Sequence, residues 1–248
     1  MLVKSKNMIE KMRFAGKLLA QVMAEVDYCL KPGADTLEID GIIENKMCAL
    51  GLKPECKGYA GYRHATCISV NDGIIHGVPS KDVILNSGDF VKIDVVGSIK
   101  GYCADITRYF FIENVSSDVK KIANAAQEAL DMAIEMAVPG NMVSDISASV
   151  QNCIESKGYS VIRDFAGHGI GKNLHEKPDI PNYRRRSGDF VLLEGMTLAI
   201  EPMIAQGSYE VLILDDGWTA KTADGKLAAH VEDTIVVLKG GAEILTRI

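Results

Sequence analysis

The sequence lacks the cysteine patterns that mark a disulfide scaffold or a zinc finger. Its six cysteines, at positions 29, 48, 56, 67, 103 and 153, include no Cys-x-x-Cys pair. A chain of 248 residues buries enough apolar surface to fold without cross-links, so we expect reduced thiols. The N-terminal residues do not resemble a signal peptide, and no apolar run approaches the roughly 18 residues of a membrane span. We therefore expect a cytoplasmic protein with no membrane partner.

Positive charge is also scarce. The chain carries 27 Lys and Arg against 33 Asp and Glu, which gives a formal net charge of −6. Nucleic-acid binders need the opposite balance, so we expect no nucleic-acid partner. Apolar residues make up 47% of the sequence and charged residues 24%, which is typical of a folded globular protein and excludes a disordered one.

The spacing of apolar residues predicts two pairs of helices. In four segments these residues recur every three or four positions, as they do on one face of a helix. The predicted helices are 6–28, 36–50, 117–137 and 143–157. An Asp35-x-x-Glu38 signal caps the second of them. Runs typical of strands follow the first pair at 66–70, 90–96 and 102–112, and further strands follow the second pair. This order favours an α+β fold.

The second half of the chain repeats the first. Adding 107 to the numbers of seven residues reaches an identical residue each time: Pro32 and Pro139, Gly33 and Gly140, Ile39 and Ile146, Gly51 and Gly158, Leu85 and Leu192, Gly88 and Gly195, Ile93 and Ile200. The same shift relates Asp94 to Glu201. A rival shift of 100 aligns 87–90 with 187–190 but leaves the helix ends unaligned. We predict one domain with two similar halves, about 1–112 and 113–248.

Two acidic residues flank a glycine-rich turn. If the chain turns between Ile99 and Lys100, Asp94 and Asp105 lie directly opposite each other, with Cβ atoms about 5 Å apart on one face. Two carboxylates among apolar neighbours repel each other, so they require a cation between them or an exposed hairpin where water solvates both. The hairpin alone leaves both interpretations open.

Two further acids favour the cation. Glu201 and Glu232 each interrupt an apolar strand, and a carboxylate is rarely buried without a partner. With Asp94 and Asp105 they would converge on the axis that relates the two halves. Four carboxylates favour divalent cations, and a histidine among them favours Mn, Fe, Co or Zn over Ca or Mg. A shared pair of carboxylates is typical of dinuclear hydrolases.

Of the five histidines, three lie in loops rich in Gly or Pro. Glycine lets backbone and ligand approach closely, which makes His76, His168 and His175 candidates for a site, although each alone is also consistent with an ordinary surface histidine. We interpret His64 and His230 as ordinary surface residues.

Taken in order, these motifs resemble the methionine aminopeptidases, in particular the short bacterial type I enzymes, over essentially the whole chain. The matching motifs are His76-Gly-Val-Pro, Val91-x-Ile-Asp94, Asp105, Gly167-His168-Gly-Ile-Gly with His175, Ile200-Glu201-Pro202-Met203, and Glu232 before Thr234-Ile-Val-Val. The resemblance implies the pita-bread fold, an α+β architecture of two pseudo-twofold-related halves with an antiparallel sheet and two helix pairs. It also implies a single catalytic domain over 1–248.

The resemblance implies a centre of two divalent metal ions. Asp105 and Glu232 would bridge the ions, Asp94 would bind one of them, and His168 and Glu201 would bind the other. The physiological metal stays open among Co, Mn, Fe and Zn, because such a donor set accepts each of them.

The resemblance also assigns catalytic and substrate-binding roles. His175 would hydrogen-bond the developing oxyanion, His76 would contact the scissile amide nitrogen, and Glu201 would accept the proton of the attacking water. The pocket for the methionine side chain maps onto Cys56, Tyr59, Tyr62, Cys67, Leu174 and Trp218.

Two positions depart from the usual family pattern. Leu174 stands where an aromatic residue is frequent, which bears on the shape of the pocket. Asp233 follows Glu232 where a histidine is usual, which bears on the surroundings of the metal ligands and on metal affinity.

The implied activity is removal of the initiator methionine from nascent peptides and proteins, with a small second residue favoured. The implied partners are nascent N-termini, with the ribosome as a further candidate, and we expect a monomer. One alternative is another pita-bread peptidase, such as a prolidase or aminopeptidase P, but these carry an extra N-terminal domain that we do not expect here. The other is an inactive binding module of the same fold, but such modules lose metal ligands. Assays on Met-Ala-Ser and Xaa-Pro peptides separate the first, and metal analysis separates the second.

Overall fold

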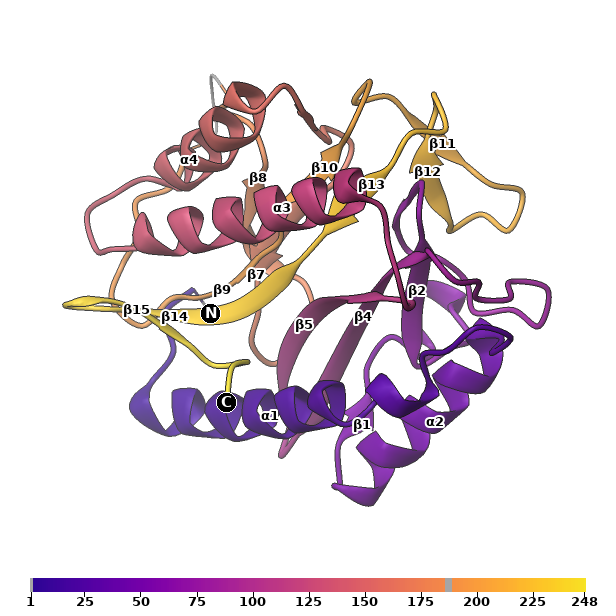
Figure 1. The fold of residues 1–248 in the computed structure, drawn as a ribbon. Helices are drawn as coiled ribbons and strands as arrows, with labels where there is room; N and C mark the ends of the chain where they lie inside the picture. Colours follow the sequence, from indigo (N-terminus) through magenta and orange to yellow (C-terminus); the bar gives the residue numbers. More distant parts are fainter. Residues whose placement is uncertain (1, 186–188) are drawn as a thin grey trace.

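Four helices in two pairs form the outer part of the molecule (Figure 1). The computed structural model describes residues 2–185 and 189–248. The helices are α1 (Lys6–Ala24), α2 (Thr36–Ala49), α3 (Ser117–Glu135) and α4 (Val143–Ser156). All four predicted helices are confirmed, and the Asp35 side chain caps α2 by accepting a hydrogen bond from the Glu38 amide at 2.8 Å. The first helix ends earlier than predicted, because buried Val26 belongs to the entrance of a separate 3₁₀ turn, η1 (Asp27–Cys29).

Within residues 2–185 and 189–248, the strands form one large and two small antiparallel sheets. Their bounds are β1 (Lys53–Pro54), β2 (Thr66–Val70), β3 (Gly73–Ile75), β4 (Phe90–Ile99), β5 (Tyr102–Phe111), β6 (Ser160–Val161), β7 (Ala166–Gly169), β8 (Glu176–Pro181), β9 (Thr197–Ile200), β10 (Met203–Ala205), β11 (Val211–Ile213), β12 (Ala220–Thr222), β13 (Ala228–His230), β14 (Glu232–Leu238) and β15 (Gly241–Ile244). The large sheet has the order β1-β4-β5-β14-β9-β7-β8, with β2 beside β4 and β15 beside β14. The small sheets are β13-β10-β6 and β11-β12-β3.

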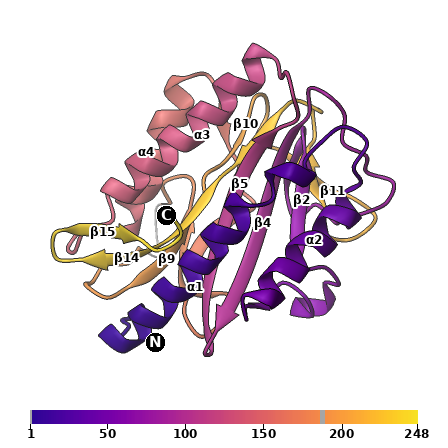
Figure 2. The same ribbon diagram turned by 60° about the horizontal axis from the view of Figure 1, so that its bottom comes forward.

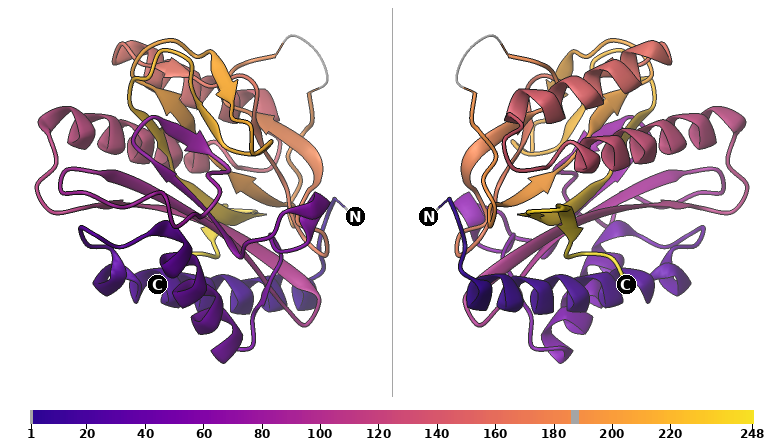
Figure 3. Two further views of the ribbon diagram at one scale, coloured as in Figure 1. Left: turned by 90° about the vertical axis from the view of Figure 1, so that its right-hand side faces the viewer. Right: turned by 90° about the vertical axis from the view of Figure 1, so that its left-hand side faces the viewer.

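Each helix pair covers its own part of the large sheet. Helix α1 lies along β4 and β5, as Figure 2 shows. Buried residues of α1 and α2 belong to one apolar cluster with residues of these strands. Helices α3 and α4 pack with β9 and β14 in a second cluster. In the side views the two pairs lie at opposite ends of the molecule, with the sheet between them (Figure 3). Strand β5 comes from the first half of the chain and β14 and β9 from the second, so the place where they meet is built from both halves.

Backbone hydrogen bonds recur at the predicted shift of 107 residues. The Gly33 amide donates to the Leu85 carbonyl at 2.8 Å, and the Gly140 amide donates to the Leu192 carbonyl at 2.9 Å. Both glycines have a positive φ, +89° and +96°, which few other residues adopt without strain. Of the rival alignment, residues 187–188 lie outside the described part of the chain.

The β4–β5 hairpin corrects one prediction. Asp94 pairs with Thr107 and Asp105 pairs with Val96, so the two acids are diagonal neighbours and do not lie directly opposite each other. The turn is centred one residue later than expected, on Lys100 and Gly101, which both have positive φ angles of 53° and 75°. The register changes by two residues, so both carboxylates still lie on one face of the sheet.

Two further observations concern the cysteines and the lengths of the helices. All six cysteines are free thiols, and five of them are buried. Over residues 2–185 and 189–248, no helix has the length and apolar character needed to cross a membrane.

Candidate metal centre

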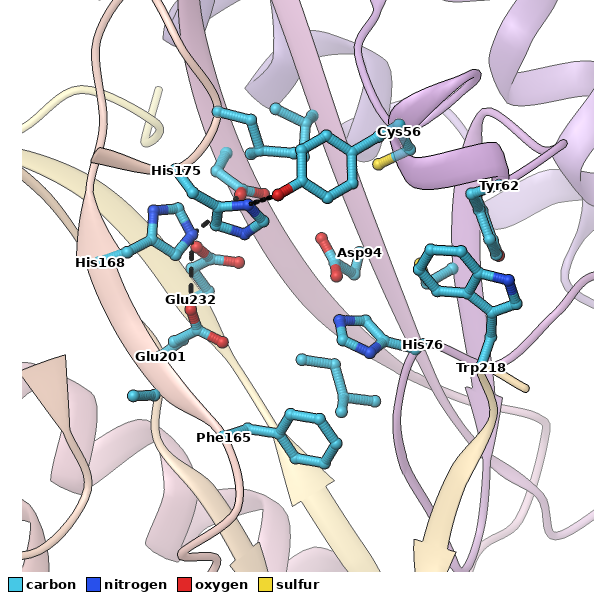
Figure 4. A pocket seen from close by; sticks show the side chains of 17 residues that line it. Cys56, Tyr62, His76, Asp94, Phe165, His168, His175, Glu201, Trp218 and Glu232 are labelled. Atoms are coloured by element: carbon cyan, nitrogen blue, oxygen red, sulfur yellow. Dashed lines mark hydrogen bonds and ion pairs between the residues drawn. The ribbon is translucent and has the colours of Figure 1, made fainter. Parts of the chain in front are cut away.

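All of the predicted site residues line one pocket of about 190 Å³, whose wall comes from both halves of the chain (Figure 4). These residues are Cys56, Tyr59, Tyr62, Cys67, His76, Asp94, Asp105, His168, Leu174, His175, Glu201, Trp218 and Glu232. Four lining residues were not predicted: Ile75, Val96, Phe165 and Ala166. Their apolar character does not distinguish a residue that faces a pocket from one in the core.

The sheet order brings the four carboxylates together. Asp94 and Asp105 lie on the adjacent strands β4 and β5, Glu232 begins β14, and Glu201 directly follows β9. Strand β14 lies between β5 and β9. The hydroxyl of Thr107, which is opposite Glu232, donates a hydrogen bond to Glu232 Oε2 at 3.0 Å. Acids far apart in the sequence therefore meet at one point of the sheet.

His168 presents its Nε2 atom to this cluster. Nε2 lies 3.7 Å from Asp105 Oδ2 and 3.6 Å from Glu201 Oε1. Its Nδ1 lies 3.0 Å from the Gly169 carbonyl, and because a carbonyl only accepts, Nδ1 carries the proton of the neutral ring. The Nε2 lone pair is then directed at the acids, as in a metal-binding imidazole. Ligand atoms of Asp105, His168 and Glu232 lie within 4.8 Å of one another.

Burial makes this group of acids costly without a cation. Desolvation, followed by repulsion from neighbouring carboxylates, raises the pKa of Asp105, Glu201 and Glu232 well above the usual range. Desolvation also raises the pKa of Asp94. Burial lowers the pKa of His168 to about 4, so its ring is neutral at physiological pH. The acids can therefore ionise together only if positive charge enters the cluster.

Buried atoms without partners show whether cations fit these residues. Within the described residues there are four such side-chain atoms: Asp94 Oδ1, Asp105 Oδ1, Glu232 Oε1 and His230 Nε2. An unsatisfied buried polar group costs about 1–3 kcal/mol, so each needs an explanation. Three of the four are carboxylate oxygens of predicted ligands, which is the donor type that divalent cations bind. The residues present fit a centre of divalent cations.

His230 corrects the interpretation of this residue as a surface histidine. It is 1% exposed and lies on β13 opposite Met203, with Nε2 3.5 Å from Glu201 Oε2. A search for histidines in Gly- and Pro-rich loops passes over it because it lies in a strand. The signal in the sequence was that His230 stands two residues before Glu232, a spacing that puts both side chains on the same face of a continuous strand. His64 lies outside the pocket wall, half-buried, with Nδ1 3.3 Å from Asp40 Oδ2.

His175 and His76 approach the cluster from different parts of the wall (Figure 4). The His175 ring centroid is 4.4 Å from that of His168, and its Nδ1 is 2.7 Å from the Tyr59 hydroxyl. The His76 ring packs edge-on against the Phe165 ring, with ring centroids 5.3 Å apart. Desolvation lowers the pKa of His76 to about 4, so this ring is also neutral. Desolvation also lowers the pKa of His175, so two neutral imidazoles border the acids.

The remaining wall is rich in sulfur and aromatic surface. Tyr62 and Trp218 form an edge-on pair with ring centroids 5.0 Å apart, and the Tyr62 hydroxyl donates to the Thr66 carbonyl at 2.9 Å. The thiols of Cys56 and Cys67 belong to buried residues on the same wall. Leu174, one of the two departures from the family pattern, is buried and lines the pocket.

Asp233, the other departure, does not line the pocket. Its fully buried carboxylate accepts hydrogen bonds from Arg108 at 2.6 Å, Arg247 at 2.7 Å and the Thr246 hydroxyl at 2.7 Å. Arg108 also donates to the Glu232 carbonyl at 2.6 Å. The side chain of Asp233 therefore ties strands together, and it is linked to the backbone of Glu232 through Arg108.

A pocket that joins buried carboxylates and a neutral imidazole to an apolar wall has the architecture of a metal-dependent hydrolase. The sequence pattern of metallopeptidase family M24 matches residues 10–239. The chain is 43% identical over 247 residues to the methionine aminopeptidase of Clostridium perfringens, covering 100% of this chain and 99% of that one. It is 40% identical to the methionine aminopeptidase of Escherichia coli K12, covering 98% and 93%. The chain therefore belongs to metallopeptidase family M24 and, within it, to the methionine aminopeptidases.

Solved structures agree with this assignment. The methionine aminopeptidase of Thermotoga maritima matches with a TM-score of 0.97 and 40% identity over the full length of both chains. A prolidase from Pyrococcus horikoshii matches with a TM-score of 0.81 and 25% identity, and this chain covers 63% of it. These neighbours confirm the predicted α+β pita-bread fold.

Proposed function

We propose that this protein removes the initiator methionine from nascent peptides and proteins by metal-assisted hydrolysis, with a small second residue favoured. The observation that carries the proposal is one pocket that places buried, unpaired carboxylates beside a wall of thiols and aromatic rings. A methionine thioether packs favourably on such a wall. The peptide carbonyl of a residue seated there would lie toward the acids. The 43% identical methionine aminopeptidase supports the same substrate.

The residues that would hold two divalent cations are Asp94, Asp105, His168, Glu201 and Glu232. Three of these residues each have a buried carboxylate oxygen without a hydrogen-bond partner. The Nε2 atom of His168 lies near the carboxylates of Asp105 and Glu201. When bound, the cations would lower the pKa of the attacking water and polarise the scissile carbonyl. Co, Mn, Fe and Zn all suit this donor set.

The chain's own residues then position the reacting groups. The water oxygen bonds to the carbonyl carbon, and Glu201 accepts the proton and returns it to the leaving nitrogen as the C–N bond breaks. The Tyr59 hydroxyl lies 2.7 Å from His175 Nδ1. When this phenol donates a hydrogen bond to Nδ1, the proton of the neutral His175 ring is on Nε2. His175 then donates from Nε2 to the oxyanion. His76, on another part of the wall, contacts the leaving nitrogen.

We infer that the protein acts as a monomer in the cytoplasm on nascent N-termini, with the ribosome as a further partner. The six free cysteines support a reducing compartment.

The substrate is tested by comparing peptides on purified protein supplied with Co²⁺ or Mn²⁺. We expect kcat/KM for Met-Ala-Ser to exceed that for Leu-Ala-Ser by about 10- to 200-fold, the usual discrimination of an apolar pocket, and to fall for Met-Leu-Ser. Preferential cleavage of Ala-Pro-Ser would instead indicate an enzyme like aminopeptidase P, and preferential cleavage of the dipeptide Ala-Pro one like a prolidase. Absence of both turnover and bound metal would indicate an inactive binding module.

A further inference from the structure

The four buried side-chain atoms without a hydrogen-bond partner are all of types that can bind a cation. Asp94 Oδ1, Asp105 Oδ1 and Glu232 Oε1 belong to proposed metal ligands, and their missing partner is explained by a cation. The fourth atom, His230 Nε2, belongs to a residue to which the family resemblance assigns no role. It is also the only one of the four that is a nitrogen donor. The same explanation applies to it if its lone pair binds a cation.

The two oxygens of Glu201 each have an imidazole nitrogen at nearly the same distance. His168 Nε2 is 3.6 Å from Oε1, and His230 Nε2 is 3.5 Å from Oε2. A charge-assisted hydrogen bond would be shorter, about 2.7–2.9 Å. Two donor atoms that each lie about 2.1 Å from one cation, at about 110–120°, are about 3.4–3.6 Å apart. The His230–Glu201 distance therefore suits two ligands of one ion better than a hydrogen bond.

The strand arrangement holds the His230 ring in this place. His230 is the last residue of β13 and pairs with Met203 on β10, while Glu232 begins β14 in the large sheet. Around Glu201 the chain passes from β9 in the large sheet to β10 in the small sheet, and between His230 and Glu232 it passes back from the small sheet to the large one.

We infer that His230 is a further ligand of the metal centre, with Nε2 binding a cation together with Glu201. The centre then has two imidazole nitrogens, His168 and His230, among four carboxylates. A second imidazole favours Co²⁺ and Zn²⁺ over Mn²⁺ and Mg²⁺, so His230 is also a determinant of metal selectivity. The inference rests on the proposed metal centre and does not depend on the methionine substrate.

Metal binding to the full-length, metal-free protein tests the inference without an activity assay. The variants are His230→Gln and, as a matched control, His64→Gln, which changes a histidine outside the pocket. We expect His230→Gln to raise at least one Co²⁺ dissociation constant by tenfold or more, as loss of a metal-site residue typically does, and to alter the visible Co²⁺ absorption bands. The Mn²⁺ constants should change by less than about threefold, because Mn²⁺ gains less from a nitrogen ligand. His64→Gln should match the wild type.

The outcomes of the binding experiment distinguish failure of the proposed function from failure of the inference about His230. If the wild type binds no divalent cation, the proposed function fails together with the inference. If the wild type binds Co²⁺ and His230→Gln leaves both affinity and spectrum unchanged, only the inference is overturned. A slower kcat with unchanged Co²⁺ binding also overturns it, because His230 would then act as a hydrogen-bond donor to Glu201.

A measurement on the wild type covers the case in which His230→Gln does not fold. X-ray absorption of protein loaded with two Zn²⁺ counts imidazole ligands per ion. Two histidines shared by two ions give an average of one imidazole per Zn²⁺, which is the expected result. An average of one half, from His168 alone, would overturn the assignment of His230.

Discussion

His175 lies where the pocket wall meets the acid cluster. Its ring is 4.4 Å from that of His168, yet its Nδ1 is 2.7 Å from the Tyr59 hydroxyl. If the Tyr59 phenol donates to Nδ1, the His175 Nε2 carries the ring proton and has no lone pair for a cation. His168 instead carries its proton on Nδ1, beside the Gly169 carbonyl, and its Nε2 lone pair is free. This contrast supports a catalytic role for His175 outside the metal ligands.

Replacing His175 by Ala should slow the reaction without weakening metal binding. Loss of one oxyanion donor costs about 2.7–4 kcal/mol, so kcat on Met-Ala-Ser should fall by about 100- to 1000-fold. The Co²⁺ dissociation constants, measured by calorimetry, should stay close to those of the wild type. Tyr59→Phe keeps the aromatic ring and removes the hydroxyl, and should give a smaller loss of kcat. Unchanged turnover in His175→Ala would disprove the role.

The carboxylate of Asp233 connects strand β14 to strand β5 and to the C-terminal segment. Asp233 lies on β14, beside Glu232 in sequence, and its carboxylate pairs with Arg108 of β5 and Arg247 near the C-terminus. The site-bearing strands β5 and β14 are thereby held together on the side away from the pocket. A buried carboxylate with two arginine partners leaves uncompensated charge when it is removed.

Asp233→Asn should destabilise the fold by about 3 kcal/mol because it leaves Arg108 without its buried partner. Urea unfolding of the metal-free protein measures the change. The matched control is Asp131→Asn, which removes the exposed partner of Arg247 and should cost less than about 1 kcal/mol. Equal losses in the two variants would contradict the importance of burial at Asp233.

Elements that depend on nearby residues could be predicted from the sequence, and those that depend on distant pairing could not. The helices follow from a local apolar period, and the cap at Asp35 follows from a local hydrogen bond. The predicted register of the β4–β5 hairpin was wrong, because the actual register depends on a positive φ at Lys100, which few residues with a side chain adopt. The burial of His230 depends on a change of sheet between β13 and β14, which spacing does not show.

In the whole molecule, the two halves meet at a site where buried carboxylates repel one another when they are ionised and no cation is bound. The 107-residue repeat could be predicted because identical turns recur, and the two halves use the same backbone hydrogen bonds at Gly33 and Gly140. Assigning roles to the converging acids needed the family resemblance, because repulsion alone allowed an exposed hairpin.

Metal binding should stabilise the protein more at higher pH. The pKa of Asp105, Glu201 and Glu232 is raised in the metal-free fold, so the native state holds protons that the unfolded chain releases above about pH 4.3, and these groups lower stability as pH rises. Cations bind the ionised acids, so they remove this penalty. Calorimetry should show a larger gain in Tm from Co²⁺ at pH 7.5 than at pH 5.5. At 100 times Kd the gain corresponds to about 2.7 kcal/mol. An equal gain at both pH values would contradict this account.

Release of methionine should depend on bound metal. Protein freed of metal by a chelator should not cleave Met-Ala-Ser, and stoichiometric Co²⁺ or Mn²⁺ under anaerobic conditions should restore cleavage. Asp105→Asn, which removes a proposed bridging carboxylate, should not regain activity under the same conditions. Full activity of the metal-free wild type, or full recovery of Asp105→Asn, would contradict a metal-assisted methionine aminopeptidase at this site.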